Sequence, residues 1–445
     1  MPVLGTQLWE GEDLAPQIAI SVNHQEIDLN IMRLITEVEY DSSDNIADMM
    51  KLRISNPEFM VTDQKVFQVG NIIKLWVGFS DMTYVGAVII EKVRPSFPKG
   101  DAMPTIDIVG YSAERLMMRN EPNSSDEKKP FLTLEEQEKL RKKEHRDKVR
   151  GIVPFKGRIW KDGLLYSNVV EEKANEYQFN HDVDVTPTNI VGPAGMIQKV
   201  GMSDYSLVAG VANELIWLFW VDMEEQDESW SLHFKDPDGF DGVQDRKYTF
   251  KYNSGDGTSL QEFDGEQLMG EGVTDLKVQL KNPKTGLLES ISVIGDPSEE
   301  ESVEFSGIID DPIKKDGAPK NGAQLALGFG NVSVKVVADR QFQTPAEVRE
   351  WAEKWYNENH RDFYSGKGEV VGPGAETLRA MQVHELQGLG EAWSGDYYFT
   401  NVNLKVNAET GLVATFSGRK ILAPSFSDYA TATANIPELV EALNA

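Results

Sequence analysis

The chain has no cysteine among its 445 residues, which excludes a disulfide framework, a thiolate zinc site and a cysteine nucleophile. It also lacks long apolar runs. Its most apolar stretch, residues 215–221, is far shorter than the ~20 residues that a bilayer-spanning helix needs. Residues 1–20 lack the basic and apolar regions of a signal peptide. We therefore expect no membrane-spanning segment.

Cationic residues are scarce. Lysine and arginine total 44 against 72 aspartates and glutamates, which gives a formal net charge of −28. Proteins that hold nucleic acids need cations to neutralise phosphates, so this balance argues against ordinary DNA binding. It fits either a solubilising, self-repelling surface or a surface that DNA passes without sticking, and charge alone does not separate the two.

Catalytic signatures are missing as well. No two of the six histidines are three or four residues apart, and the chain contains neither H-E-x-x-H nor G-x-S-x-G. His181, Asp182 and Asp184 are three possible metal ligands in one short segment. We expect an exposed polar strand there, with Asp182 on the face opposite the other two, rather than a metal site. No catalytic residue, cofactor or metal ligand is predicted.

Short alternating runs of apolar and polar residues dominate the first 119 residues. A hairpin is predicted over residues 18–29, with its turn near Asn23 and His24. Further alternating runs cover residues 50–54, 73–79, 85–89 and 106–108. Strands at this density favour a small β-barrel or sandwich whose edges are closed or covered. We expect a first β-barrel domain over residues 1–119, ending in a short helix over residues 111–118.

A second β unit is predicted near the end of the chain. Val402, Leu404 and Val406 alternate with polar residues, a turn covers residues 407–411, and the alternation resumes at Leu412. A capping box at residues 344–347 predicts a helix before it. We expect a helix and a second β-barrel domain over residues 331–423, followed by a tail over residues 424–445.

The middle of the chain is mixed. Residues 120–150 predict a charged helical excursion, which is either a solvated helix or a basic arm that docks on an acidic neighbour such as another copy of the chain. Residues 151–237 predict an α+β domain, with a helix capped by Ser203 or Asp204 and then a hairpin. Residues 238–330 predict a β-rich domain with long acidic loops. The expected fold class is α+β, mainly β.

Several segments, taken in order, resemble a known family. They are residues 40–48, 52–57, 70–79, 108–116, 203–213, 217–221, 394–397, 402 and 416–419. In this order the chain resembles the baseplate hub proteins of contractile phage tails, the late control protein D family, which is related to the first part of the VgrG spike of type VI secretion. None of these segments is a specific motif alone.

The resemblance implies a ring-shaped homotrimer. Two barrel domains in each subunit would form a pseudo-sixfold ring that matches the sixfold tail tube to the threefold central spike and forms part of the DNA ejection channel. The implied partners are the tail spike protein, the tail tube or tube-initiator protein, the tape measure protein and the baseplate wedge proteins, with transient passage of DNA. The implied location is the virion tail baseplate, assembled in the host cytoplasm.

The sequence departs from the VgrG pattern after residue 423, where VgrG proteins carry an oligonucleotide-binding-type domain and a β-helical spike. We therefore expect a separately encoded spike rather than a secretion role. A barrel in such a ring needs one face toward the lumen. Glu37, Glu39, Lys51 and Arg53 lie opposite the apolar residues of their strands and are the candidate lumen-facing residues. The same four residues would also be expected on the solvent-exposed face of an ordinary barrel.

Two other classes of function remain open at this point. The chain could be a tail-associated peptidoglycan or polysaccharide hydrolase, but its carboxylates are so numerous that no acid–base pair stands out. It could also be a β module that binds a host glycan. A structural, non-enzymatic role is the prediction that best accounts for the missing catalytic motifs.

Overall fold

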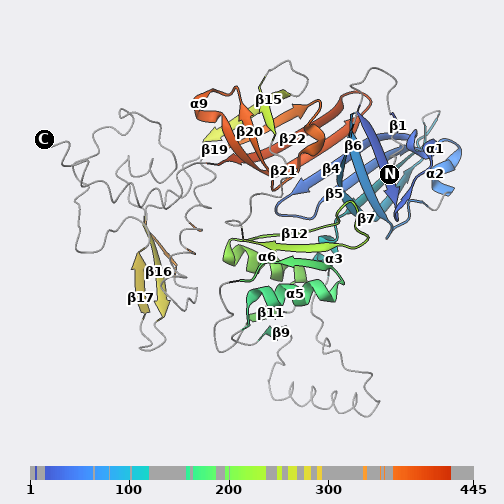
Figure 1. Cartoon of the computed structure of the whole chain (residues 1–445). Helices are drawn as coiled ribbons and strands as arrows, with labels where there is room; N and C mark the ends of the chain where they lie inside the picture. The colour runs from blue at the N-terminus through green and yellow to red at the C-terminus, as the bar shows by residue number, and fades with distance from the viewer. Residues whose placement is uncertain are drawn as a thin grey trace, which may run out of the picture. The chain divides into compact units, whose positions relative to one another are not determined.

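The computed structural model divides the chain into two compact units (Figure 1). The first contains Met1–Ser112, Asp222–Trp230 and Asp236–Ala445, and the second contains Ala113–Val221 and Ser231–Lys235. The structure describes residues 6–7, 16–63, 66–79, 81–100, 103–119, 157–160, 164–186, 196–199, 201–236, 248–252, 259–267, 275–281, 288–292, 334–337, 351, 355 and 364–421.

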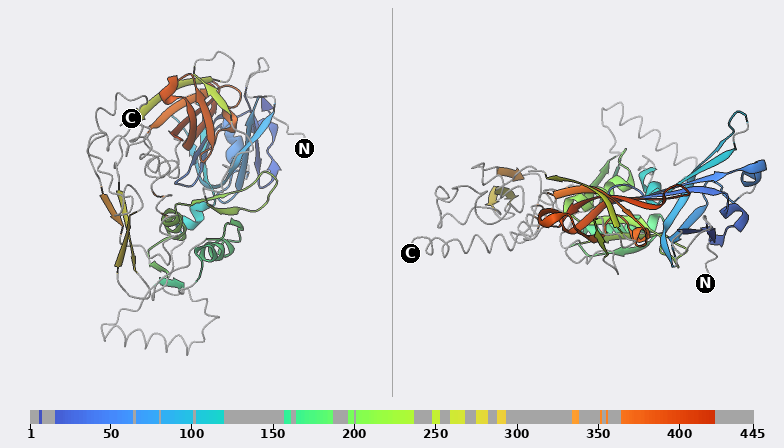
Figure 2. Two further views of the ribbon diagram at one scale, coloured as in Figure 1. Left: turned by 60° about the vertical axis from the view of Figure 1, so that its left-hand side comes forward. Right: turned by 90° about the horizontal axis from the view of Figure 1, so that it is seen from above.

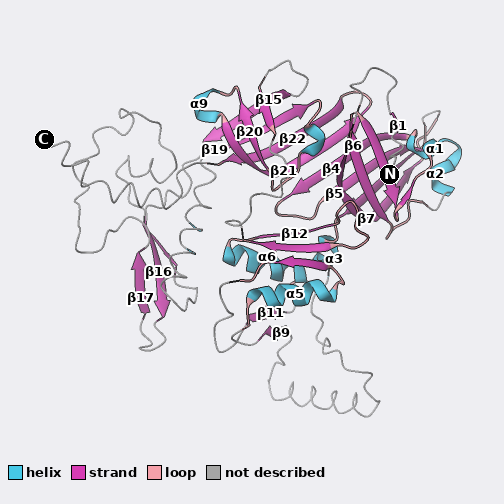
Figure 3. Ribbon diagram, viewed as in Figure 1, coloured by secondary structure: helices cyan, strands magenta, loops and turns pink. Residues whose placement is uncertain are grey.

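The described strands of the first unit include one 14-stranded sheet (Figure 3). Its order is β1-β2-β6-β7-β8-β5-β4-β21-β22-β19-β15, with β3 on β2 and with β14 and β20 attached at β21. The strands are β1 (Thr6–Gln7), β2 (Gln17–Val22), β3 (Gln25–Glu26), β4 (Ile35–Ser43), β5 (Met49–Ser55), β6 (Ile72–Gly78), β7 (Met82–Ser96), β8 (Thr105–Tyr111), β14 (Thr249–Lys251), β15 (Ser259–Gln267), β19 (Tyr364–Val371), β20 (Val383–Gln387), β21 (Gly395–Asn407) and β22 (Gly411–Lys420).

Local sequence accounts well for these strands. In β5 and β8 every second residue is buried, as the alternating apolar pattern predicts. The predicted turns are also confirmed. Asn23 and His24 both have positive φ in the tight turn between β2 and β3, a conformation that short hairpin turns require and that asparagine tolerates. Asn407 pairs with Gly411 where β21 turns into β22.

Strand β21 joins the two ends of the chain in this sheet. Its first half, Gly395–Tyr398, pairs with β20, and its second half, Asn401–Asn407, pairs with β4. A bulge between Phe399 and Asn401 separates the two halves, and β22 runs along the other side throughout. One strand near the C-terminus therefore completes the sheet that the N-terminal strands begin.

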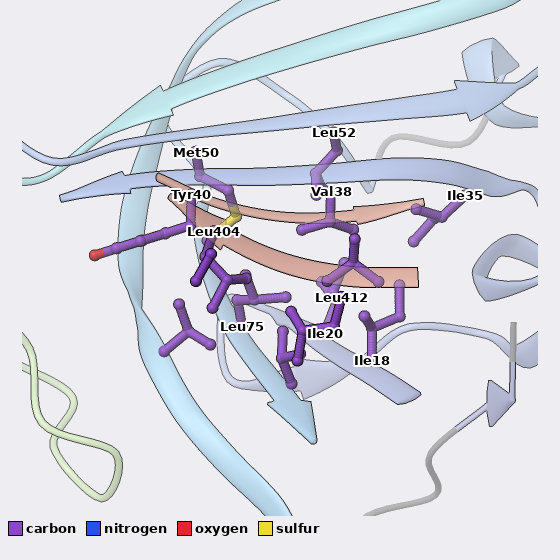
Figure 4. Packing of buried hydrophobic residues seen from close by; sticks show 14 of the residues in the cluster. Ile18, Ile20, Ile35, Val38, Tyr40, Met50, Leu52, Leu75, Leu404 and Leu412 are labelled. Atoms are coloured by element: carbon purple, nitrogen blue, oxygen red, sulfur yellow. The ribbon is translucent and has the colours of Figure 1, made fainter. Parts of the chain in front are cut away.

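The two ends of the chain also share one hydrophobic core. Leu404 of β21 and Leu412 of β22 lie among Ile18, Ile20 and Leu75 of β2 and β6, and all five are at most 3% exposed (Figure 4). Burying each such side chain contributes on the order of 2 kcal/mol, so the C-terminal hairpin is part of the core of the N-terminal half.

The mainly β character of the prediction is confirmed. The described pairings of this sheet form one main path with short branches, and none of them connects β2 directly to β4. Closure of either half into a separate barrel therefore stays a prediction, as does the trimer. Short helices cover parts of this unit, namely α1 (Leu29–Met32), η1 (Pro57–Phe59), α2 (Met60–Asp63), η5 (Ala375–Thr377) and α9 (Gly390–Trp393).

The second unit is an α+β structure. Its helices are α3 (Glu114–Arg119), α5 (Tyr166–Glu176) and α6 (Asp204–Leu215), and its strands are β9 (Gly157–Trp160), β10 (Asn180–Val183), β11 (Met196–Lys199), β12 (Leu218–Asp222), which ends in the first unit, and β13 (Ser231–Lys235). The predicted cap of α6 is confirmed, because the Ser203 hydroxyl accepts the backbone N–H of Ser206. The helix predicted over residues 111–118 begins later than expected, since Tyr111 still belongs to β8 and α3 starts at Glu114.

Beyond these elements, β17 (Leu288–Ser292), β16 (Asp275–Lys281) and β18 (Val334–Val337) form a separate sheet. The predicted charged helix within residues 120–150, the tail over residues 424–445 and most of the predicted helix over residues 344–356 lie outside the described residues. None of the helices that the structure describes is long and apolar enough to cross a membrane.

Candidate functional site

The four candidate lumen-facing residues lie on one face of β4 and β5. Glu37 is directly opposite Arg53, and Glu39 is directly opposite Lys51, in the antiparallel register of the two strands. All four side chains are partly exposed. The intervening residues, such as Val38, point the other way and are fully buried. The alternation predicted from the sequence therefore places these four side chains together.

Ion pairs connect these side chains across three strands. Arg53 Nη1 lies 3.1 Å from Glu37 Oε2, and Arg53 Nε lies 3.0 Å from Asp107 Oδ1 on β8. Lys51 Nζ lies 3.6 Å from Glu39 Oε2. The hydrogen bond to Asp107 and the charge of that carboxylate raise the pKa of Arg53 above its ordinary value. Lys51 and Arg53 therefore each have a carboxylate beside them.

The same face continues across the junction between β4 and β21. Asn401 Nδ2 donates to Asp41 Oδ1 at 3.1 Å, and Asn403 Nδ2 donates to Glu39 Oε1 at 3.1 Å. Burial raises the pKa of Asp41 above its usual value. Two amide–carboxylate contacts thus tie the C-terminal strand to the N-terminal one on the partly exposed side.

A third contact between β21 and β4 on this face is an ion pair. Lys405 Nζ lies 2.9 Å from Glu37 Oε1, and this hydrogen bond holds the pKa of Glu37 below its usual range. In the strand register Lys405 is opposite Glu39, so the contact is diagonal by two residues, as are the two asparagine contacts. We name the residues of this face that take part in these contacts the polar ladder. It consists of Glu37, Glu39, Asp41, Lys51, Arg53, Asp107, Asn401, Asn403 and Lys405.

Sequence reasoning missed five members of the polar ladder. The period-2 pattern that makes Val402, Leu404 and Val406 buried also places Asn403 and Lys405 on the other face, so this signal was present. The missing information was the pairing partner of that strand. The polar ladder holds no nucleophile with an adjacent base, and the described residues contain no group of three or more residues suited to hold a metal ion.

On the opposite face, a compact cluster surrounds Tyr40 of β4. Tyr40 Oη donates to Asp48 Oδ2 at 2.8 Å, and the Arg379 guanidinium lies over the Tyr40 ring at 5.8 Å. Arg379 Nε donates to Val85 O at 2.7 Å, and Nη2 donates to Tyr84 O at 3.0 Å. Burial raises the pKa of Asp48 to about 6. A loop of the C-terminal half thereby bonds to β7 of the N-terminal half.

Gly86 makes room for this cluster. A Cβ atom at this position would lie 2.2 Å from Tyr40 Oη, far inside van der Waals contact. Only glycine therefore lets β7 approach the tyrosine hydroxyl in this way.

The segment with three possible metal ligands is an ion-pair site. Lys235 Nζ lies 2.5 Å from Asp182 Oδ1 and 3.0 Å from Asp184 Oδ1, and His233 Nδ1 lies 3.3 Å from Asp182 Oδ2. The expectation that Asp182 lies opposite Asp184 is wrong, because residues two apart on a strand share a face. The two carboxylates together bind one ammonium group, and the strand itself is exposed, as predicted.

No protein-family model and no curated protein sequence matches the chain. Two tail proteins are among the solved structures that match its fold. A tail protein from Neisseria meningitidis MC58 has a TM-score of 0.54 at 11% identity, covering 91% of this chain and 97% of that one. The 43 kDa tail protein of prophage MuSo2 from Shewanella oneidensis has a TM-score of 0.53 at 9% identity, covering 92% of this chain and all of that one. The chain thus shares the fold of phage tail proteins, which confirms the resemblance at the level of the fold.

Proposed function

We propose that this chain is the structural hub subunit of a contractile phage tail baseplate. As a homotrimer it would adapt the sixfold tail tube to the threefold central spike and form part of the channel through which DNA is ejected. The proposal is supported by the likeness to two phage tail proteins over nearly their whole length. It places the protein in the virion tail and gives it no catalytic role.

The observation that carries the proposal is the continuous sheet with two different faces. One face is buried in the shared core, and the other carries the polar ladder across the β4–β21 junction. Such a sheet is suited to form the wall of a channel. Glu37, Glu39, Lys51 and Arg53 would then face the lumen.

The chemistry of the polar ladder suits passage of DNA without retention. Lys51, Arg53 and Lys405 each lie beside a carboxylate. Tight DNA binding depends on cations that replace the counterions of phosphates, and a cation already paired with a carboxylate contributes little. A wall of paired charges would therefore let the duplex slide.

The assembly would have four further partners. They are the tail spike protein, the tail tube or tube-initiator protein, the tape measure protein and the baseplate wedge proteins. Residues 1–119 and 331–423 would supply the two ring-forming modules. Strands β14 and β15 of residues 238–330 belong to the same sheet, and residues 120–150 and 151–237 would lie outside this wall. These boundaries are part of the proposal.

Electron microscopy of the purified full chain tests the proposal. Negatively stained particles are expected to be threefold rings with a central hole, and the mass in solution is expected to be that of a trimer. A strictly monomeric mass at high protein concentration, with no rings in the images, contradicts the proposal.

Two activity assays address the other classes of function. Zymography on peptidoglycan would favour a hydrolase if clearing vanished on substitution of one particular carboxylate. A glycan array with reproducible hits, together with failure to assemble with tail components, would favour a glycan-binding module. The proposed hub is expected to be negative in both assays.

A further inference from the structure

Charges are paired in the middle of the sheet but not at two of its edges. The polar ladder neutralises its own cations. At one edge lysines and arginines, and at another edge carboxylates, have no ion pair within the described residues. The signs of these two edges are opposite, which suggests that they recognise each other.

The first of these edges is where β7 continues past β6 (Figure 2). The pairing of β6 with β7 ends at Ile89, whereas β7 runs on to Ser96 beside β8 alone. Lys92 and Arg94 stand two residues apart on this extension, and Lys99 follows in the turn. All three are exposed and form no ion pair with the described residues. We name Lys92, Arg94 and Lys99 the basic edge.

The second edge is β15, at the far end of the strand order. Glu262, Asp264 and Glu266 alternate with residues of the other face, where Phe263 and Gly265 lie against Trp393. The three carboxylates are exposed and have no ion pair among the described residues. We name these three residues the acidic edge.

The acidic edge keeps its excess of negative charge. Lys367 of β19 lies opposite Asp264 in the register, but the two side chains form no ion pair, and Glu369 lies opposite Glu262. Beyond the contact between Tyr252 and Leu260, no described strand pairs with the outer side of β15. Among the described strands, none therefore occupies the outer side of β15 along Glu262–Gln267.

The two edges form no ion pair with each other within one copy of the chain. Six strands lie between β7 and β15 in the sheet order, which places the edges on the order of 34 Å apart along the sheet. A second copy carries both complementary edges. Contact of unlike surfaces between identical subunits repeats from copy to copy and closes into a ring when the rotation allows it.

We propose that the basic edge of one copy docks on the acidic edge of the next copy. This inference rests on the proposed trimer and names the residues that hold its subunits together. Lys92 and Arg94 are spaced as Glu262, Asp264 and Glu266 are, two residues or ~6.6 Å apart along extended strands. Pro95 removes a backbone N–H donor from the basic edge, so recognition depends on side-chain charge rather than on a full main-chain ladder.

A charge-swap experiment on the full chain tests this contact. The variant K92E/R94E and the variant E262K/E266K are each expected to associate about tenfold more weakly than the original chain, and more so at low salt. A one-to-one mixture of the two is expected to recover pairwise association, and the combined four-residue variant to recover the full oligomer. The control R33E changes the net charge by half as much as K92E/R94E does. Because Arg33 lies on neither edge, R33E is expected to leave association unchanged.

Cross-linking gives a second measurement that does not depend on stable oligomers. Because the chain has no cysteine, R94C and D264C chains can be made with one thiol each. Mixed under mild oxidation, they are expected to form the R94C–D264C disulfide in clear excess over the R33C–D264C control. Equal yields for the two pairs, or no recovery in the charge-swap mixture, would overturn the docking proposal. A trimeric ring that persists in all these variants would leave the proposed hub standing and refute only this interface.

Discussion

The β4–β21 junction has two faces that differ in almost every physical respect. On one face Leu404 and Val406 lie in the shared core, fully removed from water. On the other face Asn403 and Lys405, their neighbours in sequence, take part in the half-exposed polar ladder. Exposed ion pairs contribute little to stability, whereas buried aliphatic side chains contribute much. The difference indicates that the buried face holds the two ends of the chain together and the polar face determines what the surface can bind.

The most direct way to separate the faces is to truncate adjacent residues. Leu404→Ala is expected to lower the free energy of unfolding of the first unit by about 3 kcal/mol, because it removes buried methyl groups and leaves a cavity. Asn403→Ala is the matched control and is expected to cost less than about 1 kcal/mol. Native-state hydrogen exchange of peptides that cover β4 and β21 measures both. Equal losses of protection in the two variants would show that the faces do not differ in this way.

A smaller effect is expected where the buried face is crowded. Gly86→Ala would place a methyl group 2.2 Å from Tyr40 Oη and is expected to cost about 2 kcal/mol. Urea unfolding of G86A, Y40F and the double variant measures this cost. Since Tyr40→Phe removes the nearest atom, the double variant is expected to lose less than the sum of the single losses. Strict additivity would contradict the close contact.

The buried face is also expected to respond to pH. Asp48 has a pKa of about 6 in the folded chain, above its value when unfolded, so the folded state holds this proton more tightly. Its contribution to stability is therefore full below about pH 4 and is lost as the pH rises through 6. The groups around it are Tyr40, Ser43, Arg379 and Asp222.

Asp48→Asn tests this pH dependence. The variant is expected to lose the part of the pH dependence between pH 4 and 6 that belongs to Asp48, about 3 kcal/mol. Thermal unfolding at pH 4, 5, 6 and 7 measures it, with Glu37→Gln on the polar face as the comparison. Parallel pH profiles for the original chain and Asp48→Asn would rule out the shift.

The smallest change in stability, below about 1 kcal/mol, is expected on the polar face. Glu37→Gln removes the carboxylate that both Arg53 and Lys405 contact. Its larger consequence is expected in binding, because Lys405 becomes available to phosphates, whereas Arg53 keeps its ion pair with Asp107. Gel-shift titration with duplex DNA at 50 mM salt is expected to show weak binding by the variant and none by the original chain. Thr36→Ala, on the neighbouring position, serves as the control.

Much of the strand content follows from local patterning. The alternation around Leu52, Leu75, Ile108 and Leu404 predicts strands that the structure contains, because one buried face imposes a period of two residues. Turn residues such as Asn23 fixed the hairpins for an equally local reason. The same argument placed Glu37 and Glu39, and Lys51 and Arg53, opposite the apolar residues of their own strands. It did not predict that these carboxylates and cations pair across β4 and β5.

The pairing of β4 with β21 could not be predicted in this way. Residues such as Asp41 and Asn401 meet across the whole length of the chain, and no local pattern specifies which edge strand receives which partner. The role of Lys405 depends on this pairing and was missed with it. The contacts of Arg379 with the carbonyls of Tyr84 and Val85 were missed for the same reason. Every residue has a backbone carbonyl, so the residue types do not indicate which carbonyl accepts a hydrogen bond.

The late arrival of β21 has a consequence for synthesis on the ribosome. Asn401 is made 360 residues after Asp41, its contact on β4. At ~5–20 residues per second this is a delay of roughly 20 to 70 s. During that time the nascent N-terminal half exposes the edge of β4 and the apolar side chains that Leu404 and Leu412 later cover. Folding of the first half therefore cannot finish before translation nears its end, and a product that stops before β21 is expected to be captured by chaperones or to aggregate.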